Sequence, residues 1–250
     1  MEYQWISPHK TTADLLVFLH EGLGSTAMWR DWPAQVCEAA NCRGLVFSRY
    51  GYGASTARPL EEKWPVDYLH TQAEQALPAF FESLGLNDER PILYGHSDGG
   101  TIALLYAAMF PERVKGIVVA APHIFVEDVT IDNIHLAREA YLSTDLPARL
   151  ARYHADPDSA FWAWNDIWLD PSFRSWNIEA FLEQIRCPVL AIQGEDDHYG
   201  TLEQIKGIKR RAPQTELLIL PDCGHSPHKD QPEQIARALV SFMASLGPGC

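Results

Sequence analysis

PILYGHSDGGTIALLYAAMF, residues 91–110, decides how this chain folds. The stretch begins with a short apolar run, passes through a glycine-rich turn and continues as an apolar segment of helical length. Ser97 stands in the turn with one glycine two residues before it and another two residues after it. Glycines at these spacings let a strand and a helix approach closely at a sharp turn, which presents the serine hydroxyl as a nucleophile. The stretch therefore predicts a buried strand, a nucleophile elbow at Ser97 and a helix.

Apolar runs of strand length recur on both sides of this stretch. They lie at residues 15–19, 44–48, 116–121, 188–194 and 216–221, and most are apolar on both faces. Segments of helical period separate them, such as residues 67–84, where Pro78 predicts a kink. This alternation is typical of an α/β fold, in which crossover helices cover a mostly parallel, buried sheet. A last helix is predicted after Asp230, its expected N-cap, with Pro232 in the first turn.

Residues 122–186 interrupt the alternation. They contain no strand-like run, but they show helical patterns and four tryptophans, Trp162, Trp164, Trp168 and Trp176. Long loops without structure of their own are uncommon in compact domains. We therefore expect a helical insertion that packs onto a main unit formed by residues 1–121 and 187–250.

Acidic residues and a histidine follow the last two predicted strands. Glu195, Asp196 and Asp197 come directly after one strand, and His225 follows the next. Active-site groups of open α/β sheets lie just beyond the carboxyl ends of the strands, so these loops should meet near Ser97. A serine nucleophile needs a histidine base and an acid that orients it. Either Asp196 or Asp197 can fill the acid role on this reasoning.

The loop HEGLGS, residues 20–25, follows the strand at residues 15–19. Acyl transfer needs backbone N–H groups aimed at the developing oxyanion, and a glycine-rich loop can supply one of them. The amide of Asp98, directly after the nucleophile, is expected to supply the other. His20 is expected to organise the loop through side-chain to backbone hydrogen bonds, and His228 is expected at the surface.

Composition limits the classes of function. The chain has 250 residues, 46% of them hydrophobic and 21% charged, with a net charge of −13. A disordered chain, a collagen and a membrane bundle are excluded, and such a charge repels nucleic acid and anionic lipid. The five cysteines show no paired spacing, and the first residues show no secretory pattern. We expect a cytoplasmic protein that binds neither nucleic acid nor membranes; the sequence does not indicate an oligomeric state.

From about residue 14 to residue 246 these motifs resemble the α/β-hydrolase superfamily. In that family an oxyanion loop follows the third strand, the nucleophile stands in G-x-S-x-G, the acid ends G-x-x-D after the seventh strand, and a histidine follows the eighth. The resemblance implies a sheet of about eight strands flanked by helices. It also implies that residues 122–186 are a helical cap inserted after the sixth strand.

The resemblance also implies roles for single residues. Ser97 is implied as the nucleophile, Asp197 as the acid and His225 as the base. Gly22 and Asp98 are implied as the oxyanion donors. Glu21 stands where the family usually has glycine, so Leu23 is an alternative to Gly22.

The implied activity is that of a serine hydrolase. It would cleave an ester, thioester or lactone of a small, largely apolar molecule through an acyl-enzyme, without a metal or organic cofactor. His123, Trp162 and Trp164 are expected to contact this small-molecule substrate, although the tryptophans could instead form the core of the cap.

Other activities of the same fold stay open. Relatives with this triad cleave carbon–carbon bonds in ring-opened aromatic diketones or support perhydrolysis, and a non-catalytic ligand-binding member is a further alternative. Epoxide hydrolases and haloalkane dehalogenases of the fold need a carboxylate nucleophile, and Ser97 argues against them.

Overall fold

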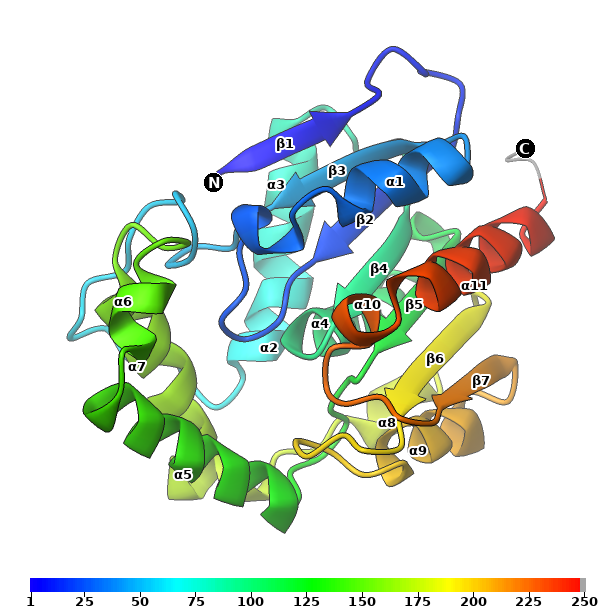
Figure 1. The fold of residues 1–250 in the computed structure, drawn as a ribbon. Helices are drawn as coiled ribbons and strands as arrows, with labels where there is room; N and C mark the ends of the chain where they lie inside the picture. Colours follow the sequence, from blue (N-terminus) through cyan, green and yellow to red (C-terminus); the bar gives the residue numbers. More distant parts are fainter. Residues whose placement is uncertain (248–250) are drawn as a thin grey trace.

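A single seven-stranded sheet forms the centre of the molecule, for which a computed structural model describes residues 1–247 (Figure 1). The strand order is β1-β3-β2-β4-β5-β6-β7, and only the edge strand β1 is antiparallel to its neighbour. The strands are β1 (Tyr3–Ile6), β2 (Leu15–Leu19), β3 (Arg43–Phe47), β4 (Ile92–His96), β5 (Gly116–Ala120), β6 (Val189–Gly194) and β7 (Thr215–Leu220).

All six strands expected from the apolar runs are present, and β1 is a seventh that the runs did not indicate. The α/β-hydrolase fold expected from the resemblance is confirmed, but the sheet has one strand fewer than the eight expected. The insertion consequently follows β5, the fifth strand of this chain, instead of a sixth.

Helices cover both faces of the sheet (Figure 1). On one face, Leu16 and Phe18 of β2 join the same apolar cluster as Val36 of α1 (Trp32–Ala39) and Leu239 of α11 (Pro232–Ser245). On the other face, the alternating residues of β2, such as Val17, pack with α4 (Asp98–Met109). Successive strand side chains point to opposite faces, so each parallel strand contributes to two cores.

The predicted helix over residues 67–84 is divided. It consists of α2 (Tyr68–Thr71), a π-helical segment (Gln72–Ala76) and α3 (Leu77–Ser83). Pro78 lies at the start of α3, where its missing N–H is tolerated, and the wider π turn precedes it. The remaining helices of the core are α9 (Glu203–Arg211), α10 (Pro227–Asp230) and the 3₁₀ turns Thr26–Trp29 and Pro111–Arg113. Helix α8 (Glu179–Leu182) lies within residues 122–186 but packs against α4 and α9 of the core.

The N-cap expected at Asp230 is wrong. Asp230 ends α10, and Gln231 precedes α11 without a side-chain cap. The carboxylate of Asp230 instead accepts the backbone N–H of Gly224 at 2.9 Å. It therefore fixes the loop that carries His225.

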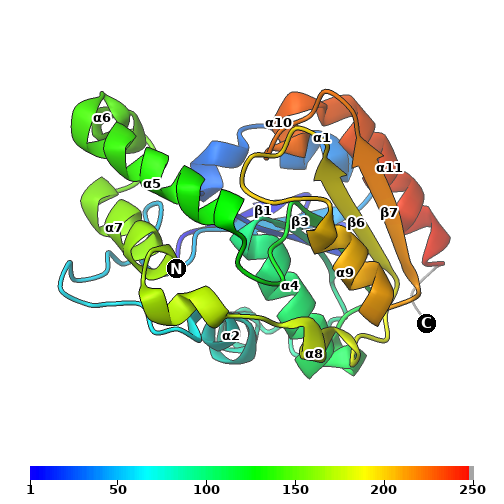
Figure 2. The same ribbon diagram turned by 90° about the horizontal axis from the view of Figure 1, so that it is seen from below.

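The inserted residues form a helical layer beyond the carboxyl ends of the parallel strands (Figures 1 and 2). It contains α5 (Asp128–Ser143), α6 (Leu146–Leu150), α7 (Pro157–Trp168) and a 3₁₀ turn (Pro171–Ser175). His154 ties this layer to the core, because its Nδ1 accepts from Gly53 N and its Nε2 donates to Leu23 O. Within residues 1–247, no helix is long and apolar enough to cross a membrane.

Candidate active site

Ser97 occupies a strained turn between β4 and α4. Its φ of 53° and ψ of −118° form a backbone conformation that residues other than glycine rarely adopt. A Cβ added to Gly95 would come within 2.2 Å of Gly99 O, and one added to Gly99 would come within 2.1 Å of Leu19 O. Both flanking glycines are therefore required by direct contact between backbones, as the spacing of the motif predicts.

The carboxyl ends of β4, β6 and β7 bring three distant side chains into one chain of hydrogen bonds. His225 Nε2 lies 3.0 Å from Ser97 Oγ, and His225 Nδ1 lies 2.9 Å from both carboxylate oxygens of Asp197. The Asp197 side chain is fully buried and also accepts from Gln193 Nε2 and the amide of Tyr199. Asp196 is exposed and makes none of these contacts within the described part of the chain.

These contacts determine the protonation of the three groups. Burial alone would raise the pKa of Asp197, but the hydrogen bond and charge of His225 and the Tyr199 amide outweigh it and hold that pKa below its usual value. Burial lowers the pKa of His225, although Asp197 opposes the shift. The imidazole is thus neutral at pH 7, with its Nδ1 proton donated to Asp197 and its Nε2 free to accept the Ser97 proton.

The loop after β2 lies directly against this arrangement. His20 organises it: Nε2 accepts from Arg49 N at 3.0 Å, so Nδ1 carries the proton and donates to Glu21 O at 2.7 Å. Gly22 lies under Trp164, since a Cβ there would approach the indole to 2.3 Å. Gly22 and Leu23 both line the cavity in front of Ser97, which leaves either amide available to an oxyanion.

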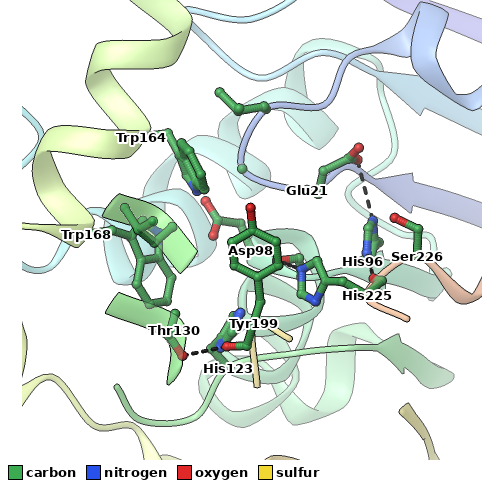
Figure 3. Close-up of a pocket in the computed structure, with 14 residues that line it drawn as sticks. Glu21, His96, Asp98, His123, Thr130, Trp164, Trp168, Tyr199, His225 and Ser226 are labelled. Carbon is green, nitrogen blue, oxygen red and sulfur yellow. Dashed lines mark hydrogen bonds and ion pairs between the residues drawn. The ribbon is translucent and has the colours of Figure 1, made fainter. Parts of the chain in front are cut away.

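The carboxylate of Glu21 points toward His96, 3.6 Å from its Nδ1 (Figure 3). It also lies 3.2 Å from Lys229 Nζ. Burial would raise its pKa, but the charge of Lys229 and the contact with His96 hold the pKa well below the usual value. His228, expected at the surface, is also buried here, with its ring 4.8 Å from those of Trp29 and His96. The expectation of an exposed His228 is wrong, because the aromatic side chains of Trp29, Trp32 and Tyr94 pack around its ring.

A small cavity opens in front of Ser97, between the core and the helical layer (Figure 3). Its volume is about 140 Å³. A cavity of roughly 150 Å³ is large enough for a benzene ring. The lining is largely apolar, as is typical of small-molecule sites, with a few polar groups from the core.

Comparison with known proteins identifies the family. Residues 16–238 match the model of the alpha/beta hydrolase family. The chain belongs to the α/β-hydrolase family. The putative carbamate hydrolase RutD of Pseudomonas savastanoi pv. phaseolicola is 24% identical over 256 residues, covering 91% of this chain and 93% of that protein. Mouse epoxide hydrolase 4 is 28% identical over 145 residues, which is 56% of this chain but only 38% of that protein.

Solved structures share the fold of this α/β hydrolase. A thermophilic esterase from Thermogutta terrifontis superposes with a TM-score of 0.75 at 18% identity, covering 98% of this chain and 93% of that one. The enol-lactonase from Burkholderia xenovorans LB400 gives a TM-score of 0.76 at 18% identity, with coverage of 97% and 96%. Together these relatives support a hydrolase.

Only some of the residues expected to contact the substrate of this α/β hydrolase lie at the cavity. His123 and Trp164 line the cavity, whereas Trp162 does not. Trp162 packs against Tyr141, and Arg138 stacks on its ring at 5.2 Å. Residues two positions apart on a helix point roughly 200° away from each other, so Trp162 and Trp164 cannot face the same space.

Several lining residues of the hydrolase site carried no motif. Trp168 follows Trp164 by four residues on α7, and Thr130 and Ile134 are four apart on α5. The i, i+4 spacing that places two side chains on one helix face would have indicated Trp168 once Trp164 was chosen. Tyr199, which also lines the cavity, lies in an irregular loop, where no periodicity applies.

Residues 1–247 contain no group of three histidine, cysteine or acidic side chains arranged to hold a metal ion. Four cysteines, Cys37, Cys42, Cys187 and Cys223, are free and buried. Cys250 lies outside the described residues.

Proposed function

We propose that this α/β hydrolase is a serine hydrolase that cleaves a short ester, thioester or lactone through an acyl-enzyme. The observation that supports the proposal is the continuous path from Asp197 through His225 to Ser97, with steps of 2.9 and 3.0 Å. Nucleophile, base and orienting acid within hydrogen-bond distance are the requirement for activating a serine hydroxyl.

The reaction begins with proton transfer. His225 Nε2 takes the Ser97 proton as Oγ attacks the substrate carbonyl, and Asp197 stabilises the imidazolium that forms. The amide of Asp98 and that of Gly22 or Leu23 bind the oxyanion. His225 then protonates the leaving alcohol or thiol. A water molecule activated by the same histidine hydrolyses the acyl-enzyme and restores Ser97.

The small cavity limits the substrate. A volume of about 140 Å³ holds a short acyl chain together with the carbonyl group, but not a long fatty acyl chain. The names of the relatives are compatible with this class of reaction, since they include a putative carbamate hydrolase, an esterase and an enol-lactonase.

Hydrolysis of p-nitrophenyl esters from acetyl to octanoyl tests the proposal. We expect turnover of the wild type to be highest with the shortest chains and to disappear in Ser97→Ala, whose fold circular dichroism should show to be intact. A fluorophosphonate probe should label the wild type and not the variant. Full turnover in Ser97→Ala would contradict the mechanism.

Two other outcomes of these experiments would favour a different function. Labelling of Ser97 without any ester turnover would favour carbon–carbon bond cleavage. A 2-hydroxy-6-oxo-6-phenylhexa-2,4-dienoate hydrolase of Burkholderia cepacia is 19% identical, over 93% of this chain and 88% of that protein. Neither labelling nor turnover would favour a ligand-binding member of the fold.

A further inference from the structure

The side chain of Asp98 is a buried carboxylate that is only half satisfied. Asp98 is 1% exposed. Its Oδ2 accepts from the hydroxyl of Tyr68 at 2.9 Å and lies 3.5 Å from the guanidinium of Arg49. Its Oδ1 is buried and has no hydrogen-bond partner among residues 1–247. An unpaired buried polar atom costs roughly 1–3 kcal/mol, and more when it is charged, so such an atom needs an explanation.

This carboxylate lies at the site where the reaction takes place. Asp98 follows Ser97 directly and is one of the residues that line the cavity (Figure 3). The proposed mechanism uses only the backbone amide of Asp98. Its side chain is therefore a charged group in the substrate cavity without a role in the chemistry.

The helical layer contributes a matching donor. Trp168 is 2% exposed, lines the same cavity, and its Nε1 also has no hydrogen-bond partner in the described chain. Burial raises the pKa of Asp98, while Arg49, Tyr68 and the indole of Trp168 oppose the shift. By geometry no hydrogen bond joins the indole N–H to the carboxylate among residues 1–247. Asp98 Oδ1 and Trp168 Nε1 are thus an unpaired acceptor and an unpaired donor on two residues that line the same cavity.

The local charge selects among the groups that could occupy this space. Arg49 is buried and already compensates the negative charge of Asp98. A substrate ammonium would add an uncompensated charge to a buried site, which is unfavourable. A hydroxyl adds no charge, and it can donate to Asp98 Oδ1 and accept from Trp168 Nε1 at the same time.

We propose that Asp98 and Trp168 bind a hydroxyl group of the substrate, within a few carbon atoms of the scissile carbonyl. The substrate class is then a short hydroxylated ester or lactone, which replaces the expectation of a largely apolar molecule. This inference rests on the proposed serine hydrolase function, because it concerns the same cavity.

Matched pairs of esters test the inference, with acid release followed by pH-stat titration. Phenyl butanoate is compared with phenyl 2-hydroxybutanoate and phenyl 3-hydroxybutanoate, and ethyl butanoate with 2-hydroxyethyl butanoate, so that both sides of the carbonyl are covered. We expect kcat/KM of the wild type to favour one hydroxylated ester about 10- to 100-fold over its partner, as a hydrogen bond to a charged group allows.

Variants assign the preference to the two side chains. Asp98→Asn should reduce the ratio of the two kcat/KM values to within about threefold, and using a ratio removes any common loss of turnover. Trp168→Phe keeps the ring and removes the donor, so it should lower the ratio about 5- to 10-fold. Trp176→Phe is the matched control, because Trp176 Nε1 is also buried without a partner in residues 1–247 but does not line the cavity. It should leave the ratio unchanged.

The outcomes separate this inference from the proposed function. Ser97-dependent hydrolysis with no preference for any hydroxylated ester would overturn the inference and leave the serine hydrolase in place. A preference that persists in both Asp98→Asn and Trp168→Phe would also overturn it. Failure of every ester together with failure of Ser97 to react with a fluorophosphonate would overturn both. If Asp98→Asn does not fold, the wild-type ratio and Trp168→Phe still decide.

Discussion

Two adjacent aspartates, Asp196 and Asp197, differ only in their surroundings. The first is exposed, whereas the second has a buried side chain against His225 and accepts two further hydrogen bonds, one from Gln193 Nε2 and one from the amide of Tyr199. An acid that orients a histidine has to be fixed in this way, because its task is to hold one tautomer of the imidazole.

We expect Asp197→Asn to lower kcat/KM for a short ester by about 10³- to 10⁴-fold, because the amide favours the wrong tautomer of His225. Asp196→Asn changes the same chemical group one residue earlier and should alter kcat/KM less than twofold. Steady-state kinetics on the best p-nitrophenyl ester measure both. Equal losses in the two variants would contradict the assignment of the acid.

The pH dependence of turnover should follow the histidine. Because burial lowers the pKa of His225, the neutral base is present throughout the neutral range and is lost only on acidification. We expect kcat/KM to be constant above pH 7 and to fall toward acid with a midpoint below about 6.5, the unperturbed value. A midpoint above 7, measured by initial rates in buffers of constant ionic strength, would show that the base is in another environment.

The sequence predicts those parts of the candidate site that depend on the backbone, such as a tight turn or the end of a strand. It does not predict which side chains surround a given group in the folded protein. The turn at Ser97 needs particular glycines, and His225 follows a recognisable strand, so both leave a pattern. The free carboxylate oxygen of Asp98 leaves none, since it depends on the positions of Tyr68 and Arg49, which are far away in sequence. His228 was misplaced for the same reason, since its ring is buried by Trp29 and Trp32, which are far away in sequence.

At the scale of elements, β2, β4 and α4 approach one another closely at the turn that carries Ser97. A Cβ on Gly99 would come within 2.1 Å of Leu19 O, and backbone cannot move aside as a side chain can. The apolar runs predicted these strands. The sequence YQWI of β1 was not predicted as a strand, because it is short and lies partly exposed at the edge of the sheet. Edge strands bury only part of their surface and so carry a weak pattern.

We expect Gly99→Ala to destabilise the fold by about 3 kcal/mol or more, because its Cβ would collide with Leu19 O. Gly85→Ala is the matched control: Gly85 has a φ of 69°, but a Cβ there would meet nothing within 4 Å. It should cost only about 1 kcal/mol of backbone strain. Urea unfolding followed by circular dichroism measures both. Similar losses would mean that the close approach at the elbow is not stabilising.

At the scale of the whole molecule, six histidines have a pKa lowered by burial: His20, His70, His123, His154, His225 and His228. For His123 the pKa falls to about 3. In the unfolded chain each has a value near 6.5, so below that pH the unfolded state binds more protons than the folded state. Stability is therefore complete above pH 6.5 and decreases as the pH falls.

The free energy of unfolding should decrease between pH 7 and pH 5, by up to about 1.4 kcal/mol per pH unit for each buried histidine. His228→Phe removes one of these groups and should make the decrease shallower. His9→Asn, at an exposed position, should not change it. Urea titrations at several pH values give the slopes. A wild-type stability that stays constant over this range would contradict the burial of neutral histidines.

The strand order has a consequence for how the protein is made. After β3, each new strand from β4 to β7 joins the same growing edge of the sheet, so a chain leaving the ribosome can add its strands in turn. Ser97 is in place early, but His225 is 128 residues later, roughly 6–25 s at typical rates of translation. A nascent chain thus carries the proposed nucleophile without its proposed base. While residues 122–186 are translated, one edge of β5 has no partner, because β6 has not yet been made. An unpaired strand edge can pair with another chain, so a chaperone would be most useful during this interval.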